Sequence, residues 1–469
     1  MKKFISLFLS VLFLLTCLVG CAAQEKENTD TIDTVSTNAE TDDFPDIPKQ
    51  DNGGKEFNIL YPKWSLYDGD YYFADGMNGA VVGDQSFIRM KVVEEHLGIK
   101  IVPTVTTNDM WGGVIDVMKR VKISGMSDTD DYQMVLTHCF NGITSTATEG
   151  YLLDYANLPN IDLDADYWRK EQMASIAING AMYFGSGSFI IPDPCLMLFN
   201  KETIKSFSNL SSDDLYQSVR DKTWTIEKLK QYASNINAED NYGFSTIVDW
   251  ELIAFMASEG YYSATKNSDG EFELLDFNEK IDNICLKVEE LVEASYSHKC
   301  EAIEERDRIM TSGKTMFTTA GLSYSINMVS NSRSAIGILP YPSITEGVES
   351  QNLDWSGYMV IPATVKDKKL TGAVSELLCY YGEKNVYPAF FDKLLGGRTA
   401  NNVEDVEMLD LIFDNLVFDP SLTFCDAADS HLGFLFYVVP RTVRAEGGVN
   451  VASYFGEFYA SASEKLVFN

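Results

Sequence analysis

Aromatic residues beside aspartate and asparagine are the residues of this chain whose types and spacing best suit a chemical task. The sequence holds 6 Trp, 24 Tyr and 27 Phe, which make 12% of its residues. Aromatic faces stack on the C–H faces of pyranose rings, while amides and carboxylates hydrogen-bond to sugar hydroxyls. Any single Trp is equally well explained as a half-buried packing residue, so this interpretation depends on the group. The group, at expected loops, is Trp64, Tyr67, Asn108, Asp109, Trp111, Asp249, Trp250 and, after Asp354, Trp355.

Patterns for catalysis and phosphate binding are incomplete. Gly185–Ser188 lacks the glycine that a serine-hydrolase elbow places two residues after its serine. Ser312–Thr315 resembles the end of a phosphate loop, but Arg308 stands where that loop needs glycine. Asp193 with any glutamate would suit a glycosidase, yet 69 acidic residues make such a pair uninformative. We therefore expect no catalytic residues, no cofactor and no metal.

The eight cysteines give no metal-binding pattern. Cys17 falls in the apolar N-terminal segment, and Cys21 has a separate role described below. The other six are far apart, without a C-x-x-C pair, so a structural zinc site is not expected. The spacing leaves open whether Cys285 pairs with Cys300. The six are Cys139, Cys195, Cys285, Cys300, Cys379 and Cys425.

The N-terminal segment predicts export and lipidation. Lys2 and Lys3 precede an apolar run, Phe4–Leu15, which is too short to span a bilayer but has the length of a signal-peptide core. It ends in Leu-Val-Gly-Cys at 18–21, which resembles the lipobox of bacterial lipoproteins. The resemblance implies a signal peptide over 1–20 and a lipid on Cys21. The alternative is an ordinary signal peptide with an incidental cysteine.

Residues 21–54 are expected to form a disordered, acidic tether. From residue 22 they contain nine acidic and two basic residues and few large apolar side chains, so burial cannot offset the entropy of ordering them. The whole chain has a formal charge of -32. This charge argues against nucleic acid, which needs a basic surface, and against docking on anionic lipid.

From residue 55 the pattern is that of an α/β protein. Strands are expected at 55–61, 99–105 and 132–136, with helices at 86–98 and around 111–123 between them. This alternation predicts a parallel sheet with helices on its faces, and ligands bind such sheets at the carboxyl ends of the strands. The loops after these three strands are therefore the first places to look for a site. Further helices are expected at 223–237, 278–295 and 368–382.

Five segments, in order, resemble the extracellular solute-binding proteins of ABC importers, in the carbohydrate-binding group that includes maltose-binding protein. One looks like the family's lobe-crossing strand and contains Phe199-Asn200-Lys201; another, with Gly313-Lys314, looks like the return crossing. The resemblance covers nearly all of 55–469. The segments are 150–168, 178–204, 215–233, 310–321 and 336–342.

The resemblance implies a two-lobed, type II periplasmic-binding-protein-like fold, each lobe a mostly parallel sheet flanked by helices, with the ligand in the cleft between them. The two crossing segments, Phe189–Leu198 and Met316–Gly321, are the implied hinges, and Pro192 and Pro194 would stiffen the first. The implied lobes are 55–190 plus 320–385 and 191–319 plus 386–469.

The resemblance further implies binding residues and partners. Sugar contacts fall on Trp64, on Asp249 with Trp250, and on the segment with Ser323 and Tyr324, where maltose-type relatives often carry Trp. Asp193, in the first crossing, joins these candidates. The expected partners are a carbohydrate, ABC permease subunits and, through the lipid, the outer face of the cell membrane of a Gram-positive bacterium. A monomer without nucleic acid is expected.

Two other functions stay open at this point. A lipid-anchored surface glycosidase would use two of the acidic residues, and a binding protein could instead serve a sensor kinase or take peptides. Turnover of a substrate would identify the first, and the neighbouring genes would distinguish import from sensing.

Overall fold

The computed structural model divides the chain into two compact units, Met1–Phe44 and Pro45–Asn469. The description covers residues 44–64, 71–139, 142–208, 210–236, 239–247, 251–396, 403–428, 444 and 451–466. The predicted signal peptide and Cys21 lie outside this part of the chain. Everything below concerns the second unit. Among the described residues, no helix combines the length and the apolar character that a membrane crossing requires.

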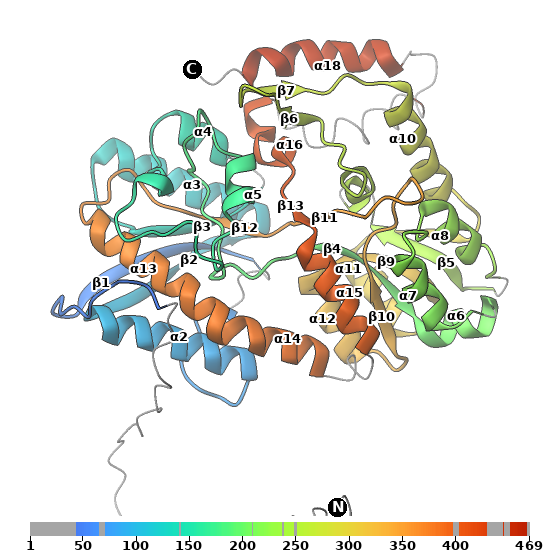
Figure 1. Cartoon of the computed structure of the whole chain (residues 1–469), viewed down its shortest axis with the longest axis horizontal. Helices are drawn as coiled ribbons and strands as arrows, with labels where there is room; N and C mark the ends of the chain where they lie inside the picture. Colours follow the sequence, from blue (N-terminus) through green and yellow to red (C-terminus); the bar gives the residue numbers. More distant parts are fainter. Residues whose placement is uncertain are drawn as a thin grey trace, which may run out of the picture. The chain divides into compact units, whose positions relative to one another are not determined.

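The first sheet has the strand order β12-β3-β1-β2 (Figure 1). Strands β2 and β3 run parallel to β1 on either side of it, and β12 pairs antiparallel with β3. Parallel strands need crossover connections, and the helices between these strands supply them. The strands are β1 (Lys55–Lys63), β2 (Ile99–Asp109), β3 (Met134–His138) and β12 (Gly357–Val360).

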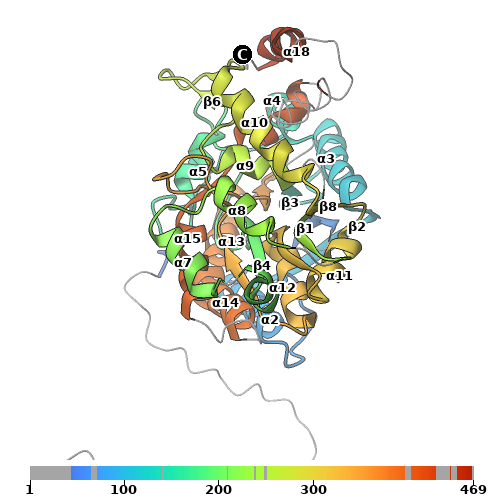
Figure 2. The same cartoon turned by 90° about the vertical axis from the view of Figure 1, so that its right-hand side faces the viewer.

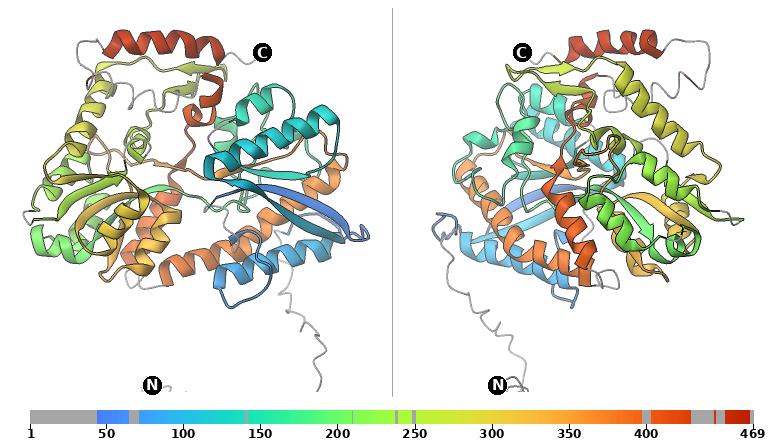
Figure 3. Two further views of the ribbon diagram at one scale, coloured as in Figure 1. Left: turned by 180° about the vertical axis from the view of Figure 1, so that it is seen from behind. Right: turned by 45° about the vertical axis from the view of Figure 1, so that its right-hand side comes forward.

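Helices cover both faces of this sheet. Helix α3 packs against β1, β2 and β3, while α13 and α14 pack along α2 (Figure 3, left). Helix α2 ends at Gly98, which adopts the left-handed conformation (φ 61°) that favours glycine. The helices are α2 (Val81–Leu97), α3 (Met110–Ser127), α4 (Ile143–Thr148), α5 (Lys170–Ser175), α13 (Lys368–Tyr381) and α14 (Tyr387–Gly396), with a 3-10 turn, η3 (Tyr155–Asn157), and a π turn, η5 (Gly382–Val386).

The second sheet has the order β10-β4-β9-β5-β8. Strands β9, β5 and β8 are parallel, whereas β4 is antiparallel to both of its neighbours, so this sheet, like the first, is mixed. The strands are β4 (Cys195–Asn200), β5 (Tyr242–Ile247), β8 (Ser297–Cys300), β9 (Thr315–Gly321) and β10 (Ile336–Leu339).

Local signals set the ends of several helices around the second sheet. The Thr225 hydroxyl accepts from the N–H of Lys228 at the start of α8, and the Asn278 side chain caps α10 in the same way. The helices are α6 (Lys201–Ser208), α7 (Ser212–Arg220), α8 (Ile226–Ala233), α9 (Ala254–Ala257), α10 (Glu279–Val292), α11 (Ile303–Thr311), α12 (Leu322–Asn331) and α15 (Val403–Asp414), with a 3-10 turn, η4 (Glu251–Ile253).

Short elements complete the second unit. The antiparallel pair β6–β7 contacts α16 and α18, and β11 pairs with β13 (Figure 1). These elements are β6 (Ala264–Lys266), β7 (Phe272–Leu274), β11 (Asn352–Leu353), β13 (Leu416–Val417), α16 (Pro420–Thr423), η6 (Cys425–Ala428) and α18 (Val451–Lys465).

Two connections between the sheets run side by side. Residues 186–194 lead from the first sheet to β4, and residues 340–356 lead from β10 to β12; a bridge between Pro194 and Asp354 joins them. Of the first hinge candidate, Phe189–Leu198, residues 189–194 lie on the first connection, whereas residues 195–198 belong to β4. The second, Met316–Gly321, is wrong: it forms most of β9, which is hydrogen-bonded on both sides within the second sheet. The return crossing is 340–356 instead.

The lobe boundaries also differ from those expected. Strand β10, which the expected division puts in the first lobe, pairs with β4 in the second sheet, from Ile336↔Asn200 to Leu339↔Met197. Helix α14, expected in the second lobe, packs on α2 beside the first sheet. In both cases the packing partner is far away in the sequence.

The expected tether is too long by its last ten residues. Residues 45–54 pack against the end of α2: Ile47 is 4% exposed, and its carbonyl lies 2.7 Å from His96 Nε2. Backbone bonds from Gln50 to His96 and from Gly54 to Gly98 continue the contact. One buried isoleucine and these bonds order a segment whose composition alone predicts disorder.

Candidate ligand-binding site

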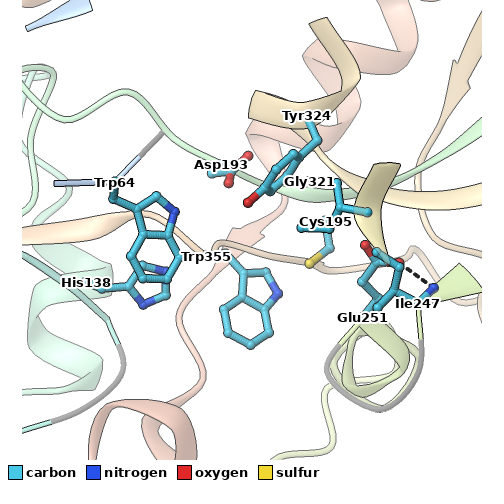
Figure 4. A pocket seen from close by; sticks show the side chains of 10 residues that line it. Trp64, His138, Asp193, Cys195, Ile247, Glu251, Gly321, Tyr324 and Trp355 are labelled. Atoms are coloured by element: carbon cyan, nitrogen blue, oxygen red, sulfur yellow. Dashed lines mark hydrogen bonds between the residues drawn. The ribbon is translucent and has the colours of Figure 1, made fainter. Parts of the chain in front are cut away.

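A pocket lies where the two sheets approach each other (Figure 4). The first sheet contributes residues at the carboxyl ends of β1 and β3, and the second contributes residues at the ends of β5 and β9 and from α11 and α12. This is the edge at which α/β sheets bind ligands. The lining residues are Trp64, His138, Asp193, Cys195, Ile247, Glu251, Ile303, Gly321, Tyr324 and Trp355.

Three aromatic rings form one wall of the pocket. Trp64 and His138 are stacked, with ring centroids 4.7 Å apart and planes at 15°. Trp355 lies on His138 at 6.0 Å and 40°. Both tryptophans are only 9% exposed. Burial lowers the pKa of His138 to about 3, so its imidazole is neutral at physiological pH and adds a polar ring without charge.

Asp193 places a buried carboxylate beside this wall. It accepts hydrogen bonds from the backbone N–H of Ser323 (2.7 Å) and from the Ser323 hydroxyl (2.9 Å). Burial raises its pKa to about 6, and the two bonds from Ser323 oppose that rise. A side chain at Gly321 would place its Cβ 3.1 Å from Asp193 Oδ1, so the small residue leaves room for the carboxylate. Asp193 is therefore mostly ionised at neutral pH and can accept hydrogen bonds.

Glu251 supplies a second carboxylate, held from behind by a buried arginine. It accepts from the Arg306 guanidinium and from the Thr319 hydroxyl. Burial raises the pKa of Glu251, and the charge of Arg306 opposes this. Arg306 has no exposed surface; it also donates to the Thr319 carbonyl (3.2 Å), and its guanidinium lies 5.6 Å from the ring of Tyr324. This network fixes Glu251 and Tyr324 in the pocket wall.

The two connections between the sheets meet beside the pocket through Asp354. Its Oδ1 accepts the N–H of Asp193 (2.9 Å) and that of Ser356 (2.8 Å), and its Oδ2 lies 3.7 Å from Arg169 Nη1. The N–H of Trp355 in turn donates to the Asp193 carbonyl (3.1 Å). The pocket aromatic Trp355 and the carboxylate Asp193 are thus positioned by the segments that would have to bend if the lobes moved.

The structure brings together some of the residues expected from sequence. Trp64, Asp193, Tyr324 and Trp355 line the pocket, and Ser323 bonds to Asp193.

The other candidates are not brought to the pocket. Asn108 is exposed, donates to Asp116, and is not part of the lining. Asp109 ends β2 and Trp111 lies in α3, but their side chains are outside the described part of the structure. Tyr67, Asp249 and Trp250 also lie outside the described residues.

Sequence reasoning missed His138 and Glu251. A signal existed for both: His138 lies two residues after the third predicted strand (132–136), in the loop that was singled out, and Glu251 directly follows the candidate pair Asp249 and Trp250. The buried cysteine Cys195 and the apolar Ile247 and Ile303 carry no sequence pattern that would assign them to a site.

Comparison with known proteins was made by sequence and by structure. No protein-family model and no curated protein sequence matches the chain. Solved structures do match. The GacH receptor of Streptomyces glaucescens, solved unliganded and with acarbose, has a TM-score of 0.57 at 15% identity, over 87% of this chain and 99% of its own.

Two further structures match equally well. The galacto-N-biose-/lacto-N-biose I-binding protein of a Bifidobacterium longum ABC transporter, in complex with lacto-N-biose, has a TM-score of 0.56 at 12% identity, covering 89% of this chain and 98% of its own. UgpB from Mycobacterium tuberculosis, with glycerophosphocholine, has a TM-score of 0.59 at 12% identity, covering 86% and 98%. The likeness confirms the expected type II fold.

Proposed function

We propose that this chain is an extracellular binding protein that captures a carbohydrate by closure of its two lobes and delivers it to an ABC transporter permease. One observation carries the proposal: the pocket joins the rings of Trp64, His138 and Trp355 to the carboxylates of Asp193 and Glu251. Rings stack on the faces of a sugar while carboxylates accept from its hydroxyls.

The likeness to solved structures supports a small polar ligand. The matching proteins were solved with acarbose, with lacto-N-biose and with glycerophosphocholine. The first two ligands are oligosaccharide-like, and the third carries a glycerol group with hydroxyls. We infer that the ligand here presents several hydroxyls and at least one apolar face, as sugars do.

The origin of the lining residues supports closure of the lobes. Trp64 and His138 lie at the ends of strands of the first sheet, whereas Glu251 in η4 and Tyr324 in α12 follow strands of the second. A ligand that touches both sets gains contacts only when the lobes are closed around it, so binding shifts the population toward the closed form. In this proposal, the lipid on Cys21 and the acidic segment after it keep the protein near its permease.

The proposal is tested by titrating the full chain with a panel of mono- and oligosaccharides. Thermal stabilisation and tryptophan fluorescence should both respond to one sugar type, with a shift that grows as RT ln(1+[L]/Kd). Trp64→Ala should lower the affinity for that sugar by at least about tenfold, because it removes a stacking surface worth about 1.4 kcal/mol.

Phe87→Ala is the matched control. Phe87 is a half-buried aromatic on α2 and is not part of the pocket lining, so its removal should leave sugar affinity unchanged. A panel in which no sugar shifts either signal, or a Trp64→Ala variant that binds as well as the wild type, would rule the proposal out.

A glycosidase is the second candidate, because two carboxylates with raised pKa share the pocket. Against it, Asp193 is engaged by Ser323 and Glu251 by Arg306 and Thr319, which suits binding better than proton transfer. Incubating the same panel with the protein and analysing the products separates the two. Turnover that Asp193→Asn abolishes would favour the enzyme.

A further inference from the structure

Strand β8 adjoins helix α11 (Figure 2). Three side chains able to bind a metal ion meet at this place. In the described part of the chain, ligand atoms of His298, Cys300 and Glu305 all lie within 4.8 Å of one another. His298 Nε2 and Glu305 Oε1 are 3.0 Å apart. None of the three lines the pocket, so the cluster is separate from the site above.

The local fold explains why these residues converge. His298 and Cys300 are two residues apart on β8, so strand alternation places both side chains on one face. Glu305 lies in the first turn of α11, which begins three residues after the strand ends and packs beside it. The short link between strand and helix brings the carboxylate over that face.

Neighbouring groups hold two of the ligands in place. The His298 ring stacks on Tyr242, with centroids 4.4 Å apart and planes at 22°. The second carboxylate oxygen of Glu305 accepts the N–H of Glu301 at 2.8 Å. Such outer contacts orient metal ligands in known sites. The side chains of His298 and Glu305 are 28% and 26% exposed, which leaves a path from solvent.

Nearby charges permit a cation here. The buried guanidinium of Arg306, the residue after Glu305, is paired with Glu251 and with Asp307 (3.1 Å). Lys299 is engaged with Glu293 at 2.8 Å. The two cations adjacent to the cluster in sequence are therefore balanced by acids of their own, and Arg308 is a further basic residue that acts on the Glu305 carboxylate.

We propose that His298, Cys300 and Glu305 form a binding site for Zn²⁺ or a similar transition-metal ion. Imidazole, thiolate and carboxylate are the donors that zinc takes, at about 2.0–2.3 Å from the ion. Donor atoms already this close need only small side-chain rotations to meet on one ion, and a water molecule completes a tetrahedron. The expectation of no metal rested on the spacing of the cysteines. That spacing cannot reveal a site built from one cysteine, one histidine and one glutamate.

The ion would clamp the edge strand β8 to α11. The same helix carries Ile303 into the pocket and Arg306 against Glu251. Because the folded chain binds the ion through three side chains that the unfolded chain does not hold together, binding adds to the free energy of unfolding. The role is structural and does not depend on the proposed sugar site.

The test is a titration of the metal-free full chain with Co²⁺, a spectroscopic substitute for zinc. We expect one Co²⁺ per chain, a cobalt–thiolate charge-transfer band and a rise in melting temperature. Cys300→Ser should abolish the band, and His298→Ala and Glu305→Gln should each weaken binding by about tenfold or more.

Cys285→Ser is the matched control, because Cys285 is a buried cysteine of the neighbouring helix α10 outside the cluster. The cobalt–thiolate band should persist in this variant. Glu305→Gln keeps an acceptor for Glu301 and alters a half-exposed group, so it tests the site even if Cys300→Ser fails to fold. Absence of stoichiometric binding, or an unchanged band and affinity in Cys300→Ser or Glu305→Gln, would overturn the proposal.

Discussion

At the scale of the residue, Asp193 makes the stability of the fold depend on pH. It is 6% exposed, and burial raises its pKa from 3.8 to about 6. The folded state therefore binds a proton more readily than the unfolded state between these values, so this group stabilises the fold as pH falls through that window and the contribution is lost as pH rises through 6.

Asp193→Asn should remove this dependence. Between pH 7 and pH 5 the wild type should gain about 1 kcal/mol in free energy of unfolding relative to the variant. Urea unfolding of both proteins at the two pH values measures the difference, and comparing the pair cancels other buried acids such as Asp419, whose pKa burial raises to about 7. A constant difference across the window would contradict the assignment.

How much of the site the sequence could predict depends on the kind of residue. Trp64 and Trp355 were identifiable because a tryptophan after a strand, or after an aspartate, is visible as a pattern. Glu251 follows the candidate pair Asp249 and Trp250, but that position alone does not single it out among 69 acidic residues. What distinguishes it is the buried Arg306, which comes from a different helix. Partners of this kind are set by tertiary packing alone.

At the scale of the element, Gly98 ends α2 and packs against a second chain segment, and composition did not predict that packing. Its φ is +61°, and an added Cβ would lie 2.7 Å from the backbone nitrogen of Asn52 and 2.8 Å from Cα of Asp51. The sequence predicted the cap, but the close approach arises from the segment 45–54, whose acidic composition had suggested a disordered tether. The glycine therefore serves both the turn and the packing of a second chain segment.

Gly98→Ala should lower the free energy of unfolding by about 2 kcal/mol or more, because it combines a left-handed alanine with a backbone collision. Gly456→Ala is the opposite case: this residue lies in α18, and a Cβ there meets nothing within 4 Å. It should stabilise by about 0.5–1 kcal/mol. Thermal or urea unfolding of the two variants checks the contrast, and a Gly98→Ala variant as stable as the wild type would show that residues 45–54 are not packed there.

At the scale of the whole molecule, the fold class was predictable and the partition into lobes was not. Alternating strands and helices from residue 55 predict an α/β protein, and the family resemblance of five weak segments in order implies two lobes. The strand order β10-β4-β9-β5-β8 interleaves segments more than 100 residues apart. Such pairing cannot be read from local patterns, which is why β9 was taken for a crossing.

The side-by-side connections 186–194 and 340–356 set how a ligand could move the lobes. The carboxylate of Asp354, which accepts the N–H of Asp193, ties them together, so bending at one requires bending at the other. We expect a hinge motion shared by both segments when a sugar binds. Spin labels at Lys119→Cys on α3 and Asn283→Cys on α10 report the distance between the lobes.

With a sugar bound, that distance should shorten and its distribution should narrow, since the ligand gains contacts from both sheets only in the closed form. Labels at Lys119→Cys and Glu95→Cys, both on helices of the first sheet, should show no change. The cysteines that could compete for label in the described residues are buried. A sugar that binds while the inter-lobe distance stays constant would mean that capture needs no closure, because the pocket would then be complete before the ligand arrives.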